Sequence, residues 1–341
     1  MVGLQGQSGS QADDGQHRPE VLGRGMSMIR WQKKGLIYAA DERLPWAASH
    51  AQIPTLATVK DDALQILFSS RDADNRSRIA RLDVRRDAPG EILRVEPSPV
   101  LELGQIGTFD DCGTMPSSVV EHDGRLYLYY IGWNVRNTVP YHNSVGLAIS
   151  EDGGKTYRRR FEGPVMDRTA EEPYFCATTC VRIENGIWRN WYLSCTGWMR
   201  INGVAEPRYH LKYAESRDGI HWERRGLVAI DYADQDEGGI VRASVHRDGD
   251  LYRMWYSMRG HTGYRENQAA SYRIGYAEST DGIAWRRLDE QAGIDIGESG
   301  WDAFMLAYPE VFPVGERLYM LYNGNGFGAS GFGYAEAVRA T

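Results

Sequence analysis

The sequence predicts an all-β protein with the architecture of a five-bladed β-propeller. One pattern recurs along the chain: YAESRDGIHW at 213–222 returns as YAESTDGIAW at 276–285, and a related LAISEDGGKTY precedes both at 147–157. The Asp-Gly pairs of the three copies begin at residues 152, 218 and 281, which are 66 and 63 residues apart. A regular period indicates a repeat fold, and a strand that ends in an Asp-Gly turn is typical of a hairpin.

The second observation concerns the two ends of the chain. IRWQKKGLI at 29–37 resembles IHWERRGLV at 220–228, the strand that follows an Asp-Gly turn, but no earlier strands of a repeat precede it. At the other end, strands predicted at 305–312, 317–322 and 331–337 have no such strand after them. We therefore expect residues 29–37 to complete the last blade and close the ring.

The elements of each repeat are expected in one order. A polar or acidic segment, here called the lead-in, is followed by a strand, a turn such as HDG at 122–124, and a second strand rich in Tyr and Leu. A longer loop, a third strand, the Asp-Gly turn and a fourth strand complete the repeat. The five lead-ins begin at Ser49, Phe109, Glu171, Asp236 and Trp301.

The amino-acid composition predicts the domain organisation, the surface charge and the location of the protein. Residues 1–18 are rich in Gly, Gln, Ser and Asp, which predicts a disordered leader, and residues 19–341 are expected to form one domain. A net charge of −7 gives no broad basic surface for nucleic acid or anionic lipid. Without an apolar run of 18 residues or a signal-peptide pattern, the chain is predicted to be cytoplasmic.

The four cysteines, at 112, 176, 180 and 195, are too few for a disulfide framework. Reduced, small buried residues are expected, and a soft-metal site on the neighbouring thiols is the alternative. We predict no metal and no cofactor. The sequence does not indicate whether the protein is a monomer or an oligomer.

Carboxylates recur in the lead-ins and are the first candidates for a site. In a propeller the first strands of all blades line one central channel, so lead-in side chains are expected to converge there. Solvated turn residues are the alternative for each carboxylate taken singly. Four of the five lead-ins carry them: Asp110, Asp111, Glu171, Glu172, Asp236, Glu237 and Asp302.

The blade pattern, the S-x-D-G-x-x-W turns and the acidic lead-ins resemble the five-bladed propeller glycoside hydrolases and their relatives. These comprise arabinanases and β-xylosidases, invertases and levansucrases, and the mannoside phosphorylases. The resemblance covers residues 29–337 and implies an enzyme that cleaves or transfers a glycosyl unit of a small glycoside or sugar conjugate. By position, Asp111 matches the residue that supports the sugar in those families, and Glu172 matches their acid.

The departure from that pattern lies in the first repeat, where SHAQ at 49–52 replaces the carboxylate that acts as base or nucleophile. Glycoside hydrolysis usually needs two carboxyl groups. The second one is expected at Asp110, Glu237 or Asp302, or His50 serves as the base. Two alternatives stay open: a phosphorylase that uses phosphate as nucleophile, and a non-catalytic propeller that binds a glycan or a protein.

Further binding candidates lie in the loops. Trp133, Arg136 and His142 are predicted to form a sugar-binding rim, with loop packing as the alternative. Arg136 and Arg242 are predicted to hold a carboxylate or phosphate, because guanidinium groups bind such anions bidentately. Salt bridges to the lead-ins are their alternative. Asp110, Asp302 and Tyr308 complete the predicted binding residues.

Aromatic residues divide into two sets by position. Trp31, Trp222 and Trp285 recur with the fourth strand and are predicted to pack the blades. Those near lead-ins or loops are candidates for stacking on a sugar: Tyr174, Trp198, Trp301, Tyr308 and Phe327.

Overall fold

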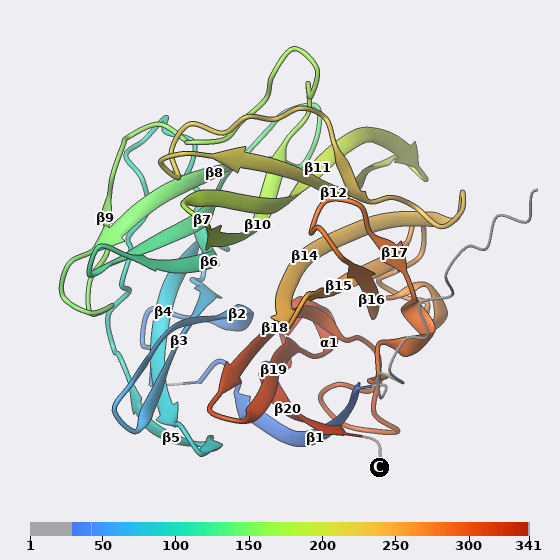
Figure 1. The fold of residues 1–341 in the computed structure, drawn as a ribbon. Coiled ribbons are helices and arrows are strands. Elements are labelled where there is room, and N and C mark those ends of the chain that lie inside the picture. The colour runs from blue at the N-terminus through green and yellow to red at the C-terminus, as the bar shows by residue number, and fades with distance from the viewer. Residues whose placement is uncertain (1–28, 42, 340–341) are drawn as a thin grey trace, which may run out of the picture.

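The computed structural model describes residues 29–41 and 43–339, and the predicted leader at 1–18 lies outside them (Figure 1). Within these residues the regular structure is almost entirely β, which confirms the predicted class. The described residues form 20 strands, two 3-10 helices, η1 (Gln268–Ala270) and η2 (Asp289–Gln291), and one short helix, α1 (Asn325–Gly328). No helix in this part of the chain is long and apolar enough to span a membrane.

The strands form five consecutive groups. The first group is β2 (Ser49–Lys60), β3 (Ala63–Arg71), β4 (Ser77–Arg85) and β5 (Ala88–Val95). The second is β6 (Gly113–His122), β7 (Arg125–Val135), β8 (Tyr141–Ser150) and β9 (Arg158–Arg159). The third is β10 (Cys176–Glu184), β11 (Ile187–Ile201), β12 (Val204–Ser216) and β13 (Val228–Ile230). Neighbours within each group pair antiparallel.

The remaining strands make the last two groups. The fourth is β14 (Glu237–Asp248), β15 (Leu251–Gly260), β16 (Arg273–Ser279) and β17 (Arg286–Arg287). The fifth is β18 (Ala307–Val314), β19 (Arg317–Asn323), β20 (Phe332–Arg339) and β1 (Ile29–Tyr38). In that last group β1 pairs antiparallel with β20, which is the pairing predicted for residues 29–37.

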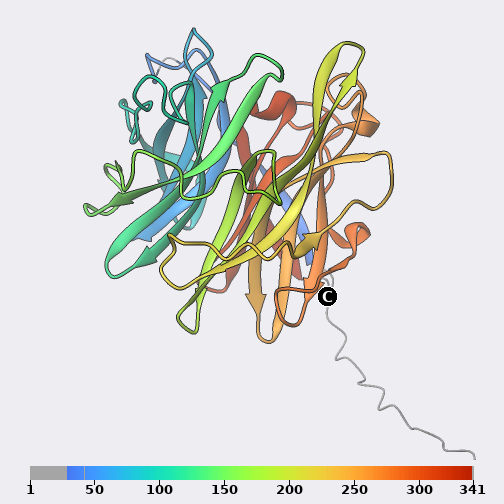
Figure 2. The same cartoon turned by 90° about the horizontal axis from the view of Figure 1, so that it is seen from above.

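The first strands of the five groups lie next to one another in a cyclic order. β2 contacts β6, β6 contacts β10, β10 contacts β14, β14 contacts β18, and β18 contacts β2. Figure 1 shows these strands nearest the middle of the molecule, with the other strands of each group further out. In the view at 90°, the hairpin of β11 and β12 extends to the upper side (Figure 2).

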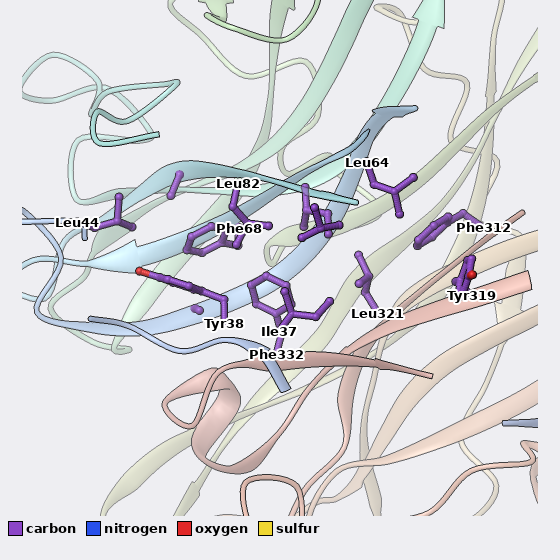
Figure 3. Close-up of a cluster of buried hydrophobic side chains, with 14 residues drawn as sticks. Ile37, Tyr38, Leu44, Leu64, Phe68, Leu82, Phe312, Tyr319, Leu321 and Phe332 are labelled. Carbon is purple, nitrogen blue, oxygen red and sulfur yellow. The ribbon is translucent and has the colours of Figure 1, made fainter. Parts of the chain in front are cut away.

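An apolar cluster joins the first group to the last (Figure 3). The ring of Phe68 on β3 lies with its centroid 5.0 Å from that of Tyr38 on β1 and 5.5 Å from that of Phe332 on β20. All three side chains are buried, and burying aromatic rings contributes strongly to core stability. β1 and β20 therefore meet through side-chain packing with β3 as well as through their own strand pairing.

The Asp-Gly turns have the predicted geometry. Gly153, Gly219 and Gly282 have φ of 73°, 71° and 75°, a region that favours glycine. In the third group, the Asp218 carboxylate accepts hydrogen bonds from the backbone N–H groups of Ile220 and His221 at 2.8 and 2.9 Å. These bonds satisfy the turn. Antiparallel pairing of β8 with β9 and of β16 with β17 forms the predicted hairpins, whereas in the third group the outer strand β13 begins only at Val228.

Candidate functional site

A cavity of about 590 Å³ lies where the five groups meet, and residues from all of them line it. Each first strand contributes at least one side chain at or beside its irregular segment, and these residues include Ile53, Met115, Ala177, Val241 and Tyr308. The third strands of the first four groups contribute Ser77 and Tyr141, which begin β4 and β8, Tyr209 within β12, and Tyr272 directly before β16. This is the size and position of a small-molecule site.

The backbone is irregular at the same place in all five first strands. Register shifts of the β-bulge kind occur at 52–55, 116–118, 176–179, 241–244 and 307–310. Ile53 and Tyr308, which line the cavity, have φ of 52° and 56°, and these values are unusual for residues with bulky side chains. Bulges and strained backbone often re-aim side chains beside functional sites.

One wall of the cavity is a cluster of tyrosines held by a buried arginine. The hydroxyl oxygens of Tyr209 and Tyr272 lie 2.5 Å apart, and Arg259 donates from Nε to the Tyr209 hydroxyl at 3.0 Å. The Arg259 guanidinium carbon also lies 3.9 Å from the ring centroid of Tyr264. Because Arg259 is only 3% exposed, it acts as a support that fixes the tyrosine rings.

The charged side chains that line the cavity among the described residues are Arg71, Arg76, Arg265 and Asp74. Arg76 forms an ion pair with Asp74 at 3.0 Å. Arg265 pairs with Glu206 at 2.6 Å. The lining therefore carries more positive than negative charge, and Asp74 is the one carboxylate that residues 29–41 and 43–339 contribute to it.

The predicted catalytic Glu172 lies in a hydrogen-bonded network rather than on the cavity wall. Its carboxylate accepts from Tyr192 at 2.9 Å, from Ser194 at 2.8 Å and from Arg224 at 2.5 Å. Burial opposes ionisation, but the hydrogen bond and charge of Arg224, with the two hydroxyls, hold the pKa of Glu172 below its usual 4.5. The group is therefore an ionised carboxylate near neutral pH.

Two other lead-in acids, Asp110 and Asp302, have equivalent surroundings. Asp110 is fully buried and accepts from Tyr130 at 2.9 Å and from Arg159 at 2.8 Å. Asp302 accepts from the Tyr322 hydroxyl at 3.1 Å and lies 2.8 Å from the Lys33 ammonium. In both groups the tyrosine comes from the second strand and the cation from the strand outside the third.

The fourth group has a variant of this arrangement, and the first group lacks it. Arg287 pairs with Glu237 at 2.7 Å and also with Asp289, which accepts from Tyr256. In the first group Phe68 occupies the position of the second-strand tyrosine, and the lead-in has no acid. The missing acid thus coincides with the missing hydroxyl, so the recurrence of acids follows a repeated structural network.

Three further predicted residues also lie off the cavity wall. His50 has its Nδ1 2.8 Å from Ser49 Oγ, and burial, with the positive charge of Arg71, lowers its pKa to about 4. Asp111 accepts from the Gly107 N–H at 2.9 Å. Arg136 is exposed in the loop between β7 and β8.

His142 and Arg242 bind neighbouring acids. His142 Nε2 lies 2.8 Å from Asp167, on the opposite strand face from Tyr141, which lines the cavity. Arg242 is fully buried and donates to Glu310 at 2.6 Å. Among the predicted binding residues, Trp133 and Tyr308 do line the cavity, as does the stacking candidate Phe327. The catalytic and binding roles assigned from the sequence stay predictions.

Comparison with known proteins places the chain among relatives. No protein-family model matches it. Over 307 residues, covering 90% of this chain and 99% of theirs, it is 39% identical to the uncharacterised proteins Rv1502 and MT1551 of two Mycobacterium tuberculosis strains, H37Rv and CDC 1551. The chain belongs to the family of these mycobacterial proteins.

Solved structures of similar fold are carbohydrate-active proteins. One is the BT0996 RGII complex, with a TM-score of 0.67, 18% identity, and coverage of 91% of this protein and 92% of that one. A structure from the GH130 family of mannoside phosphorylases, which contains glycoside hydrolases, has a TM-score of 0.67, 14% identity, and coverage of 92% and 94%. A thermostable family-43 glycoside hydrolase has a TM-score of 0.62, 16% identity, and coverage of 86% and 90%. The predicted resemblance is confirmed, as a likeness of fold.

Sequence reasoning missed most of the cavity wall. Tyr141, Tyr209 and Tyr272 lie on or directly before the third strands and precede the Asp-Gly turns by 11, 9 and 9 residues. The recurrence of these tyrosines could have predicted that they share a site. Arg71 could have been predicted less directly: it follows Phe68 on β3 by three residues, as Trp133 follows Tyr130 on β7.

Proposed function

We propose that the chain is a five-bladed β-propeller whose central cavity binds a carbohydrate or sugar conjugate. The cyclic contacts of β2, β6, β10, β14 and β18 support the count of five, since each strand begins one group. The pairing of β1 with β20 supports closure of the ring through the last group. The main observation behind the proposal is the cavity where the five groups meet, because residues of every group line it.

The chemistry of the lining favours a sugar. Its aromatic side chains offer flat apolar faces, and the tyrosine hydroxyls and the Asn143 amide offer hydrogen bonds. A cavity of about 590 Å³ has the size of a small glycoside site. The aromatic lining residues are Trp133, Tyr141, Phe175, Tyr209, Tyr264, Tyr272, Tyr308 and Phe327. The carbohydrate-active proteins among the similar structures support the same ligand class.

Binding without two-carboxylate hydrolysis is the function that this lining favours. Hydrolysis usually needs two carboxyl groups across the glycosidic bond. Within the described residues, Asp74 is the single carboxylate on the wall, and Arg76 already pairs with it. The candidate catalytic acids Asp111, Glu172 and Glu237 lie off this wall.

The test combines binding with product analysis. A panel of small glycosides and sugar conjugates is titrated calorimetrically into the full chain, and each mixture is assayed for released sugar with and without phosphate. We expect at least one member to bind, and Trp133→Ala to weaken it at least about tenfold, whereas Tyr174→Ala, on an exposed residue outside the cavity, leaves affinity unchanged.

The other outcomes identify the alternatives. Sugar released without phosphate shows a hydrolase, and phosphate-dependent release of a sugar phosphate shows a phosphorylase. Either result replaces the binding function with an enzymatic one. If no panel member binds, or if Trp133→Ala has no effect, the cavity is not the carbohydrate site.

A further inference from the structure

One arginine on the cavity wall differs from the others in its charge balance. Arg71, the last residue of β3, has no carboxylate within ion-pair distance in the part of the chain that the structure describes, unlike Arg76 and Arg265. Its Nε donates to the Gln52 side chain and its Nη1 to the Asn75 side chain, both at 3.1 Å. Both acceptors are neutral, so they orient the guanidinium without neutralising it.

The surroundings add to this imbalance. Burial lowers the pKa of the Arg71 guanidinium from its usual value, which is the direction expected for a cation without a neighbouring anion. A partly buried charge without a partner is costly for the folded protein, and a bound anion offsets that cost.

The geometry leaves part of the fork free. Among the described residues no acceptor binds Arg71 Nη2, while Gln52, itself 4% exposed, fixes the other side of the guanidinium. Arg71, Gln52 and Asn75 all line the cavity. A guanidinium that is held in place with free N–H groups matches the oxygens of a carboxylate or phosphate.

Resting on the proposed function, we propose that the sugar ligand carries an anionic group, a phosphate ester or a carboxylate, and that Arg71 binds this group. The sugar then lies against the aromatic wall, and the anion accepts hydrogen bonds from Nη2. Arg71 then selects anionic sugars over neutral ones, a selection that no lead-in residue supplies.

Matched ligands test this assignment. Calorimetry on the full chain compares, for each sugar of a panel, the methyl glycoside, the sugar 1-phosphate and the uronic acid, with inorganic phosphate as a further probe. We expect an anionic form to bind at least about tenfold tighter than the neutral form of the same sugar. Comparison of the phosphate and uronate arms identifies which anion is preferred.

Variants separate Arg71 from general charge effects. In Arg71→Gln the preference for the anionic form should disappear while the neutral glycoside still binds, which also reports a folded cavity. Arg71→Lys keeps the charge without the fork and should retain part of the preference. Arg217→Gln, on an exposed arginine outside the cavity, should retain all of it.

The contradicting results are specific. Equal binding of neutral and anionic forms, or a preference that survives in Arg71→Gln, overturns the Arg71 assignment and leaves carbohydrate binding intact. Failure of every panel member to bind contradicts the proposed function itself.

Discussion

At the scale of single residues, the lead-in acids illustrate how a recurring carboxylate can serve the fold. Asp110, Glu172 and Asp302 each accept from a tyrosine of the second strand and pair with a cation. Charge-assisted bonds of this kind hold the lead-in, just before the first strand, against the second strand of the same group. The catalytic roles predicted for these acids stay predictions beside this structural role.

Removing one such carboxylate should destabilise the protein. Glu172→Gln leaves the buried Arg224 without its anion, and breaking a buried pair in this way costs about 3–5 kcal/mol. Urea denaturation measures the change in the free energy of unfolding. Glu171→Gln is the control, because Glu171 is exposed, and its effect should stay within about 0.5 kcal/mol. A loss below that control value for Glu172→Gln contradicts a structural role.

The pKa of Glu172 gives the pH dependence of this loss. Because the pKa is lower in the folded state than the usual 4.5, the stabilisation is present above pH 4.5 and is lost as pH falls through the folded value. The stability difference between wild type and Glu172→Gln should therefore shrink at acid pH. A difference that grows on acidification has the wrong sign.

His50 reports on the charge of Arg71. Burial is the larger cause and the charge of Arg71 the smaller cause that lower the His50 pKa from 6.5 to about 4. The folded state therefore favours the neutral ring, so the stability of the fold is unaffected by His50 above pH 6.5 and decreases as pH falls from 6.5 towards 4. Arg71→Gln should raise the His50 pKa, as measured by NMR titration of the ring protons, whereas Arg217→Gln should not. An unchanged midpoint in Arg71→Gln means that the two groups are not coupled.

At the scale of elements, the N-terminal strand completes the last group. Trp31 on β1 is 6% exposed, and its ring centroid lies 5.4 Å from that of Trp255 on β15. Trp31→Ala should cost about 3–5 kcal/mol by leaving a cavity between two groups. Gln32→Ala, at the next and exposed position, should cost within about 0.5 kcal/mol in the same urea titration. Equal effects of the two changes contradict the packing role of β1.

Strand order was predictable from the sequence because it follows local patterns. The Asp-Gly turns, the alternating strands and the orphan strand at 29–37 each depend on short segments. The cavity wall was harder to predict because it depends on bulges in the first strands, which shift side chains by one position. Tyr308 and Trp133 were found as aromatic residues near loops, whereas Arg71 needed knowledge of its partners.

At the scale of the whole molecule, Arg242 connects the fourth group with the first and the fifth. From β14 its Nη2 donates to Thr55 on β2 at 3.1 Å and to Glu310 on β18 at 2.6 Å. Burial raises the pKa of Glu310, and the charge of Arg242 opposes that rise. The ionised form of Glu310 is therefore stabilised by Arg242. The arginine predicted to bind a ligand anion thus pairs with an internal acid.

A double change measures this connection. Arg242→Met leaves Glu310 without its cation and should cost about 3–5 kcal/mol in urea denaturation. Adding Glu310→Gln should recover part of that loss, because the unpaired charge is then removed. A single variant as stable as wild type, or a double variant no better than the single one, contradicts this link between the groups.

A crystal structure of the protein with the tightest-binding member of the glycoside panel tests the central claim most directly. The account predicts the sugar in the cavity against Trp133 and Tyr272, with its anionic group at Arg71. A ligand bound at Glu172 or Asp111, away from these residues, would contradict it.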